Sequence, residues 1–184
     1  MIDHSRELLF VHIARTGGTS IETALVENDW WYIEAPTKHL SAKQARLYYG
    51  EKIWNTYTKF SVVRNPWDRV ISMWSTKWWH PTRESREECS MEFFIQNLKP
   101  HPNETYNSLH YHEILNEEMD FVLRFENLQH DFSKMLISTG RENISLPHME
   151  KREHDHYRNI YSEKASQMVR KLFDKDISTF GYRF

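Results

Sequence analysis

The chain has 184 residues, an ordinary length for one domain. A multidomain organisation is therefore nearly excluded, and residues 1–184 are expected to form a single domain. Lys and Arg together number 24 and Asp and Glu 26, which gives a net charge of −2. Because there is no overall basic field to attract nucleic acid or a membrane surface, we expect neither as a partner, and any anion site must be local.

The sequence also predicts a soluble, cytoplasmic protein. The first residues contain no basic segment leading into an apolar stretch, and no run of about 18 apolar residues occurs in the chain. The single cysteine, Cys89, cannot form a disulfide within the chain, which fits a reducing compartment. We expect Cys89 to behave as a small buried apolar residue.

Three short apolar runs predict β-strands. They are continuous and rich in β-branched and aromatic residues, as is typical of strands covered on both faces of a sheet. The runs are residues 8–13, 60–63 and 121–125. The intervals between them are long enough to hold helices, which favours a mainly parallel sheet.

Helices are predicted between and after these strands. The clearest begins after the second strand, where Asn65 can cap the first turn and Pro66 suits the first helical position. Ser41 and Gln44 have the spacing of a capping box, which predicts another helix start. The other predicted helices span about residues 20–27, 90–98, 107–117, 128–138 and 162–173. This alternation predicts an α/β fold with a mainly parallel central sheet flanked by helices.

The helix after Asn65 has a clear pattern of apolar and polar positions. Its apolar stripe consists of Trp67, Val70, Ile71, Trp74 and Trp78. Arg69, Ser72 and Thr76 fall on its other face.

Two of the five glycines, Gly17 and Gly18, lie at the turn between the first strand and the first helix. Such glycines let backbone N–H groups converge on an oxyanion, and the helix N-terminus adds partial positive charge. Arg15 adds a full charge. The hydroxyl donors of the segment are Thr16, Thr19 and Ser20. The turn is therefore predicted to bind a phosphate group, the alternative being an ordinary connection between strand and helix.

Two common nucleotide-binding motifs are absent from this turn. A Walker loop, G-x-x-x-x-G-K-[ST], requires a lysine and a wider glycine spacing. A Rossmann G-x-G-x-x-G turn requires a third glycine nearby, whereas the next glycine after Gly18 is Gly50. Simple ATP hydrolysis and NAD chemistry are therefore disfavoured.

A second anion-binding segment follows the second strand. Arg64 is expected at the carboxyl end of that strand, and Ser72 on the polar face of the following helix. In a parallel sheet this end of the strands faces the ligand crevice. An arginine fork and a serine hydroxyl suit a second phosphate group. A surface salt bridge is the alternative role for Arg64, with equal weight.

Taken together, the two segments resemble the sulfotransferases that use 3′-phosphoadenosine-5′-phosphosulfate (PAPS) as sulfuryl donor. Residues 10–21, FVHIARTGGTSI, are similar to that family's loop for the 5′-phosphosulfate, and residues 63–72, VRNPWDRVIS, to its 3′-phosphate motif. Weaker similarity to the carbohydrate-type branch extends through residues 123–128, 146–148 and 176–184. The resemblance implies a P-loop nucleotide-kinase-like sulfotransferase fold.

The resemblance also implies roles for individual residues. Arg15 and residues 16–20 would hold the phosphosulfate, and Arg64 and Ser72 the 3′-phosphate, without a metal. Many relatives have lysine where this chain has Arg15, and arginine keeps the charge of that group but not its geometry. Arg152 lies in a region that approaches the nucleotide in relatives.

His39 is the predicted catalytic base. Sulfuryl transfer needs an acceptor oxygen to lose its proton, and His39 resembles the family's base-bearing histidine between the two phosphate motifs. The ordinary histidine pKa of about 6.5 suits proton abstraction at neutral pH. Without the resemblance, His39 would be interpreted as a surface histidine.

Two other groups of residues could form a metal site or an acceptor site. His110 with His112, and His154 with His156, are spaced like possible metal ligands, but they fall in predicted helix or loop and have neither a Cys pair nor H-E-x-x-H spacing. We therefore expect solvated or hydrogen-bonded histidines and no metal. The aromatic residues that either pack in the core or stack on an acceptor are Trp30, Trp31, Tyr32, Trp78 and Trp79.

The sequence therefore predicts a PAPS-dependent sulfotransferase. Its partners would be the nucleotide donor and a hydroxylated acceptor, either a carbohydrate or a small phenol, and its nucleotide product would be 3′-phosphoadenosine-5′-phosphate (PAP). One alternative is a non-catalytic binder of the same nucleotide. Another is a nucleotide or small-molecule kinase, against which the missing Walker lysine counts.

Overall fold

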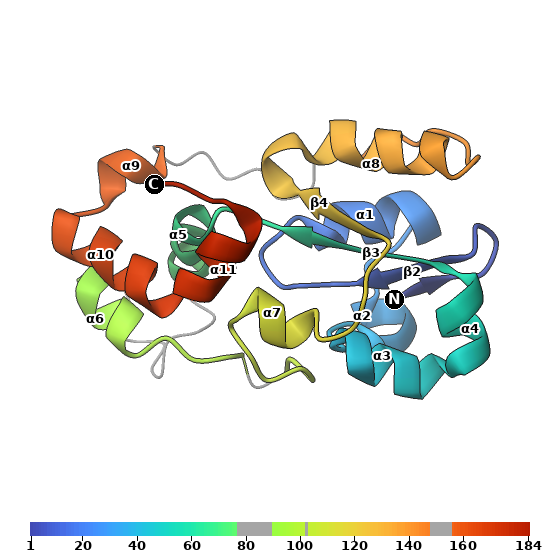
Figure 1. Cartoon of the computed structure of the whole chain (residues 1–184), viewed down its shortest axis with the longest axis horizontal. Helices are drawn as coiled ribbons and strands as arrows, with labels where there is room; N and C mark the ends of the chain where they lie inside the picture. The colour runs from blue at the N-terminus through green and yellow to red at the C-terminus, as the bar shows by residue number, and fades with distance from the viewer. Residues whose placement is uncertain (77–89, 102, 148–155) are drawn as a thin grey trace.

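The structure is a computed structural model that describes residues 1–76, 90–101, 103–147 and 156–184. Its centre is a four-stranded sheet in the order β1-β2-β3-β4 (Figure 1). The strands are β1 (Ile2–Asp3), β2 (Leu8–Val11), β3 (Thr58–Val63) and β4 (Phe121–Arg124). β1 is antiparallel to β2, and the other two pairings are parallel. The predicted α/β architecture with a mainly parallel sheet is confirmed.

One face of the sheet is covered by α1 (Gly18–Val26) and α8 (Leu128–Ser138). Successive side chains of a strand point to opposite faces, so Phe10 and Phe60 lie together on this face, with ring centroids 4.8 Å apart. Phe132 of α8 packs onto the same cluster. Figure 1 shows both helices on the same side of the strands.

The opposite face of the sheet carries the alternate residues Leu9 and Val11. α3 (Ala42–Tyr49), α4 (Glu51–Thr56) and α7 (Tyr111–Ile114) cover this face. The connection from α1 to α3 runs through two short helices, α2 (Trp31–Glu34) and η1 (Ala35–Thr37). This connection brings His39 to the end of β2.

A separate group of helices packs beyond the carboxyl ends of the strands, on the left of Figure 1. Its apolar cluster includes Trp67 and Ile71 of α5 and Phe173. The helices are α5 (Pro66–Thr76), α6 (Met91–Gln96), α9 (Tyr157–Ile160), α10 (Glu163–Leu172) and α11 (Asp174–Phe180). A further short helix, η2 (Phe125–Asn127), joins β4 to α8.

Two sequence expectations are corrected by the structure. β4 is an edge strand, and Val122 is 38% exposed, so the third apolar run is not covered on both faces. The helix expected over residues 107–117 is reduced to the four residues of α7. Arg69, Ser72 and Thr76, the polar positions of α5, are all buried. Trp78 of the expected apolar stripe lies outside the described residues.

Every helix within the described residues is too short or too polar to cross a membrane.

The capping box predicted at Ser41 is present: its Oγ accepts from the Gln44 backbone N–H at 3.3 Å, and Gln44 Oε1 accepts from the Ser41 N–H at 2.8 Å. These bonds cap the start of α3, whose first residue, Ala42, comes three positions after His39.

Replacing Ser41 with alanine removes the cap of α3. We expect Ser41→Ala to lower the free energy of unfolding by about 1 kcal/mol, as loss of an N-cap serine does, measured by urea denaturation. Lys43→Ala is the matched control, because Lys43 lies exposed in the same helical turn. An equal loss in both variants would contradict the role of the cap.

Candidate functional site

The two segments predicted to bind phosphate groups meet at the carboxyl edge of the sheet. Arg15, after β2, donates from Nε to Ser72 Oγ of α5 at 3.0 Å. Arg64, after β3, donates from Nη1 to the backbone oxygen of Arg15 at 3.3 Å. Residues about 50 positions apart in the sequence thus contact one another at the end of β2 and β3.

The glycine turn needs both of its glycines. Gly17 has a φ of 83° and directly precedes α1, a left-handed conformation that favours glycine. A Cβ on Gly18 would lie 2.1 Å from His12 Nε2, so no larger residue fits there without displacing that ring.

The hydroxyl residues of the turn are placed differently from one another. Thr16 is fully buried, and its Oγ1 donates to the Ile13 backbone oxygen at 2.7 Å, so this hydroxyl holds the turn together. Thr19 is half-buried and Ser20 is 9% exposed, and both lie in the first turn of α1.

Arg64 is a buried residue, not a surface one. It is 8% exposed, its Nε donates to Asp68 Oδ2 at 2.7 Å, and its guanidinium lies 4.0 Å from the centre of the Phe125 ring. The alternative role of Arg64, a salt bridge, is therefore confirmed by its pairing with Asp68. The expected location of that salt bridge at the surface is wrong. The carboxylate and the ring fix the guanidinium plane at the edge of the sheet.

His39 lies beside the glycine turn and is 5% exposed, so it is not a surface histidine. Its Nδ1 lies 3.0 Å from the backbone oxygen of His12. Burial lowers the pKa of His39 well below its usual value, and neighbouring His12 lowers it further. The ring is therefore neutral at neutral pH. Because a carbonyl only accepts, Nδ1 carries the proton and Nε2 presents a lone pair, as a general base requires.

Aromatic residues lie close to the His39 ring. The ring centroids of Trp31 and Tyr106 lie 5.6 Å and 5.9 Å from that of His39. Trp30 is buried in the core next to the sheet, and Tyr32 is 82% exposed. Of the aromatic residues considered for acceptor stacking, Trp31 is the one placed against His39, while Trp78 and Trp79 lie outside the described residues.

The sequence analysis missed the residues that hold the start of the glycine turn. Arg69 is 1% exposed and donates from Nε to the Ala14 backbone oxygen at 3.1 Å and from Nη1 to that of Leu109 at 2.6 Å. The Tyr106 hydroxyl accepts from the Ala14 N–H at 3.1 Å. Both peptide groups of Ala14 are thereby fixed from outside the turn, and only the tertiary contacts reveal it.

Glu104 is a second titratable group in this region. It is 6% exposed, and burial raises its pKa to about 7. Tyr106, two residues further along the chain, donates its backbone N–H to the His39 backbone oxygen at 3.1 Å. The Glu104 carboxyl interacts with the Tyr106 hydroxyl, and the Tyr106 ring in turn lies next to His39.

His110 and His112 meet a third residue that the sequence analysis did not associate with them. Potential ligand atoms of His110, His112 and Asp176 lie within 4.8 Å of one another. Asp176 is fully buried and accepts the backbone N–H groups of Tyr111 at 2.9 Å and His112 at 3.1 Å, so it caps α7 from α11. His112 Nδ1 lies 2.7 Å from the same carboxylate. His154, Cys89 and Arg152 lie outside the described residues.

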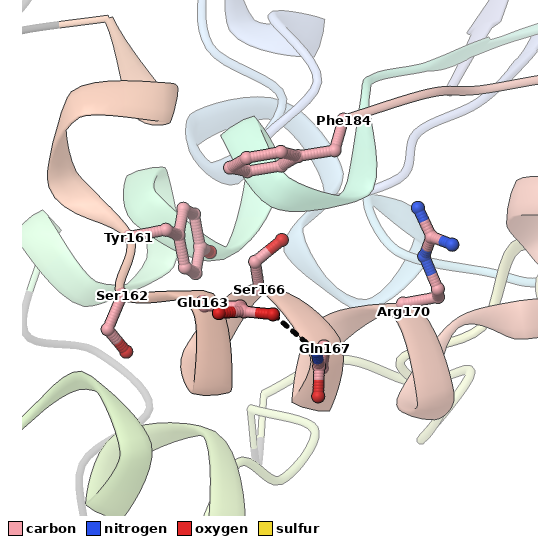
Figure 2. Close-up of a pocket in the computed structure, with 7 residues that line it drawn as sticks. All are labelled: Tyr161, Ser162, Glu163, Ser166, Gln167, Arg170 and Phe184. Carbon is pink, nitrogen blue, oxygen red and sulfur yellow. Dashed lines mark hydrogen bonds between the residues drawn. The ribbon is translucent and has the colours of Figure 1, made fainter.

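A cavity of about 560 Å³ lies apart from these residues, between α10 and the end of the chain. Figure 2 shows the Phe184 ring at the top of the view, with Tyr161 on the left and Arg170 on the right. Its lining residues are Tyr161, Ser162, Glu163, Ser166, Gln167, Arg170 and Phe184. None of the predicted site residues lines it.

Comparisons with known proteins agree with the family resemblance of the sequence. A family model described as "Sulfotransferase family" matches residues 1–183. Carbohydrate sulfotransferase 10 of Xenopus laevis is 23% identical over 180 aligned residues, which cover 70% of this chain and 48% of that protein. The chain thus spans about half the length of this curated relative. No solved structure matches the chain significantly.

Gly18 provides a test of the close approach between the turn and His12. We expect Gly18→Ala to lower the free energy of unfolding by about 1–3 kcal/mol, as overpacking of a filled site does, and to weaken PAP binding in calorimetry. Gly140→Ala is the control, because a Cβ there meets nothing within 4 Å and only its φ of 71° adds strain. Unchanged PAP binding by Gly18→Ala would contradict the assignment of the turn.

Proposed function

Because this chain belongs to the sulfotransferase family, we propose that it transfers the sulfuryl group of PAPS to a hydroxyl of a carbohydrate. The observation that carries the proposal is the direct contact of Arg15 with Ser72 and of Arg64 with Arg15, next to the buried imidazole of His39. The relative named a carbohydrate sulfotransferase supports a sugar as acceptor over a small phenol.

The donor nucleotide would bind across the carboxyl edge of the sheet. The Gly17–Gly18 turn, Arg15 and the first turn of α1 would hold the 5′-phosphosulfate, where backbone N–H groups and the helix N-terminus favour negative charge. Arg64 and Ser72 would hold the 3′-phosphate. The Arg15 to Ser72 contact supports one ligand that carries both groups.

The reaction requires one proton acceptor and one stabilised leaving group. His39 Nε2 takes the proton of the acceptor hydroxyl while that oxygen attacks sulfur in line. The bond between sulfur and the bridging phosphate oxygen breaks, and PAP departs with the bonding electrons. Arg15 stabilises the negative charge that grows on that oxygen.

A non-catalytic binder of PAP is the competing function. Such a protein would need the two phosphate segments but no oriented base. The neutral, buried and hydrogen-bonded state of His39 supports the enzyme, because this arrangement has no role in binding the nucleotide phosphates.

Discrimination of PAP from AMP tests the 3′-phosphate role of Arg64. AMP lacks that phosphate, and a charge-assisted contact contributes about 1.5–3 kcal/mol, which corresponds to roughly a 10- to 100-fold difference in Kd. We expect Arg64→Ala to remove most of the preference for PAP and to leave AMP binding nearly unchanged in calorimetry. Arg46→Ala is the control, because Arg46 is paired with Glu51 and Glu117 away from the site. Equal affinity of the native protein for both nucleotides would refute the assignment.

Replacement of His39 separates catalysis from binding. We expect His39→Ala and His39→Asn to lower kcat by about 100-fold or more, as loss of a positioned base does, while PAP affinity stays near that of the native protein. His130→Ala, at an exposed position, is the control. Unchanged turnover in the His39 variants would move the base role to another group, with Glu104 the first to test.

The pH profile has a defined direction. Only neutral His39 accepts a proton, and burial lowers its pKa, so kcat/KM should hold its full value down through the usual histidine pKa of about 6.5 and fall only at lower pH. The acidic limb should disappear in the residual activity of His39→Ala. An acidic limb centred at the usual histidine pKa would contradict the buried state of the base.

A further inference from the structure

A buried ionic cluster of Glu22, His12 and Lys38 lies next to His39, the proposed base. Glu22 of α1 is fully buried. Its Oε1 lies 2.6 Å from His12 Nδ1, and its Oε2 lies 2.7 Å from Lys38 Nζ and accepts the Trp30 N–H at 3.2 Å. Lys38 is 2% exposed and also pairs with Asp29. No step of the proposed reaction uses these groups directly.

This cluster is costly to bury. Taking an ion out of water costs several kcal/mol, and apolar residues of similar volume often stabilise a protein as well or better. Burial alone would raise the pKa of Glu22, but His12 and Lys38 outweigh burial and lower it to about 2. Glu22 is therefore a carboxylate at any pH at which the protein works.

The charge of Glu22 determines where His12 carries its proton. A carboxylate only accepts hydrogen bonds, so His12 Nδ1 must donate to Glu22 Oε1. Burial lowers the pKa of His12, which leaves a neutral ring whose Nε2 bears a lone pair. This nitrogen faces the glycine turn, at the point where a Cβ on Gly18 would come within 2.1 Å.

Two connections lead from this cluster to His39. The His12 backbone oxygen accepts from His39 Nδ1 at 3.0 Å, and the two ring centroids lie 4.6 Å apart. Lys38 precedes His39 in the chain, so the ion pair with Glu22 also anchors the backbone from which the base projects. The other titratable group packed against the His39 ring within the described residues is Tyr106.

We propose that Glu22 is a positioning residue for His39. Together with His12 and Lys38 it forms a relay, Lys38–Glu22–His12, that holds the Nδ1–H of His39 on the His12 carbonyl and so keeps the His39 Nε2 lone pair available to the acceptor hydroxyl. The same relay holds the Nε2 edge of the His12 ring against the glycine turn. The position of His39 is thereby coupled to the position of the turn that would hold the phosphosulfate. The role of His39 as base rests on the proposed function.

The first measurement uses the native protein and requires no activity. ¹⁵N NMR of the imidazole nitrogens reports which nitrogen of each histidine carries the proton. We expect the Nδ1–H tautomer at both His12 and His39. A proton on Nε2 of either neutral ring would overturn the relay.

The second measurement uses Glu22→Gln, which keeps the shape of Glu22 but removes its charge. A glutamine amide both donates and accepts, so His12 is no longer confined to one tautomer, and we expect the Nε2–H form of His12 to appear in the spectrum. We expect kcat to fall by about tenfold or more while KM for PAPS changes little, because the lost interaction orients the base and does not bind the donor. If Glu22→Gln does not fold, Glu22→Asp takes its place. Aspartate is too short to reach both His12 and Lys38, so we expect the same fall in kcat with little change in KM for PAPS.

Asp3→Asn is the matched control. Asp3 is also a buried carboxylate, 5% exposed, and pairs with Arg6 at 2.9 Å. It lies in β1, the strand at one edge of the sheet. We expect this control to lower the melting temperature but to leave kcat and both tautomers unchanged. A similar loss of kcat in Asp3→Asn and Glu22→Gln would show a general effect of stability and overturn the relay.

The outcomes distinguish the relay from the proposed function. A native protein that transfers sulfuryl groups, combined with a Glu22→Gln variant that keeps full kcat and both native tautomers, would overturn the relay alone. A native protein that binds PAP but transfers nothing across a panel of hydroxylated acceptors would refute the proposed function and the relay with it.

Discussion

The parallel pairing of β2 with β3 is the constraint on which the whole site depends. Val11, the last residue of β2, lies opposite Ser61, and the buried Ser61 hydroxyl donates to the Val11 backbone oxygen at 2.7 Å. The carboxyl ends of both strands therefore lie at the same end of the sheet, and the segments that carry Arg15 and Arg64 follow them side by side. If the pairing were antiparallel, these two segments would lie at opposite ends of the sheet.

Two charged side chains near the carboxyl ends of the strands are buried but hydrogen-bonded. The Arg69 guanidinium donates to the backbone oxygens of Ala14 and Leu109. The Asp176 carboxylate accepts from the backbone N–H groups of Tyr111 and His112. Such bonds offset the cost of removing charges from water. A rigid support for the glycine turn is the consequence, because both peptide groups of Ala14 are fixed by side chains from distant segments.

Arginine in place of the lysine of many relatives has a structural consequence. Arg15 donates from Nε to Ser72, so one side chain spans the glycine turn and the helix of the second motif. A lysine ammonium also has several N–H donors, but all of them are on one nitrogen and have no fixed plane. The guanidinium is planar and carries several donors in a fixed arrangement, which allows one of them to make this link while the charge stays at the turn.

The sequence by itself determined the three parallel strands, α8 from Leu128 to Ser138 and the capping box at Ser41, because each depends on residues close together in the chain. For the same reason it identified the two segments predicted to bind phosphate groups. Only the tertiary structure decided that Arg15 touches Ser72, that His39 is buried and neutral, and that Asp176 joins His110 and His112. It also exposed Val122 on the edge strand β4 and shortened α7. Hydrogen bonds between distant segments and the desolvation of a side chain depend on which surfaces pack together, and no local pattern of residues records that.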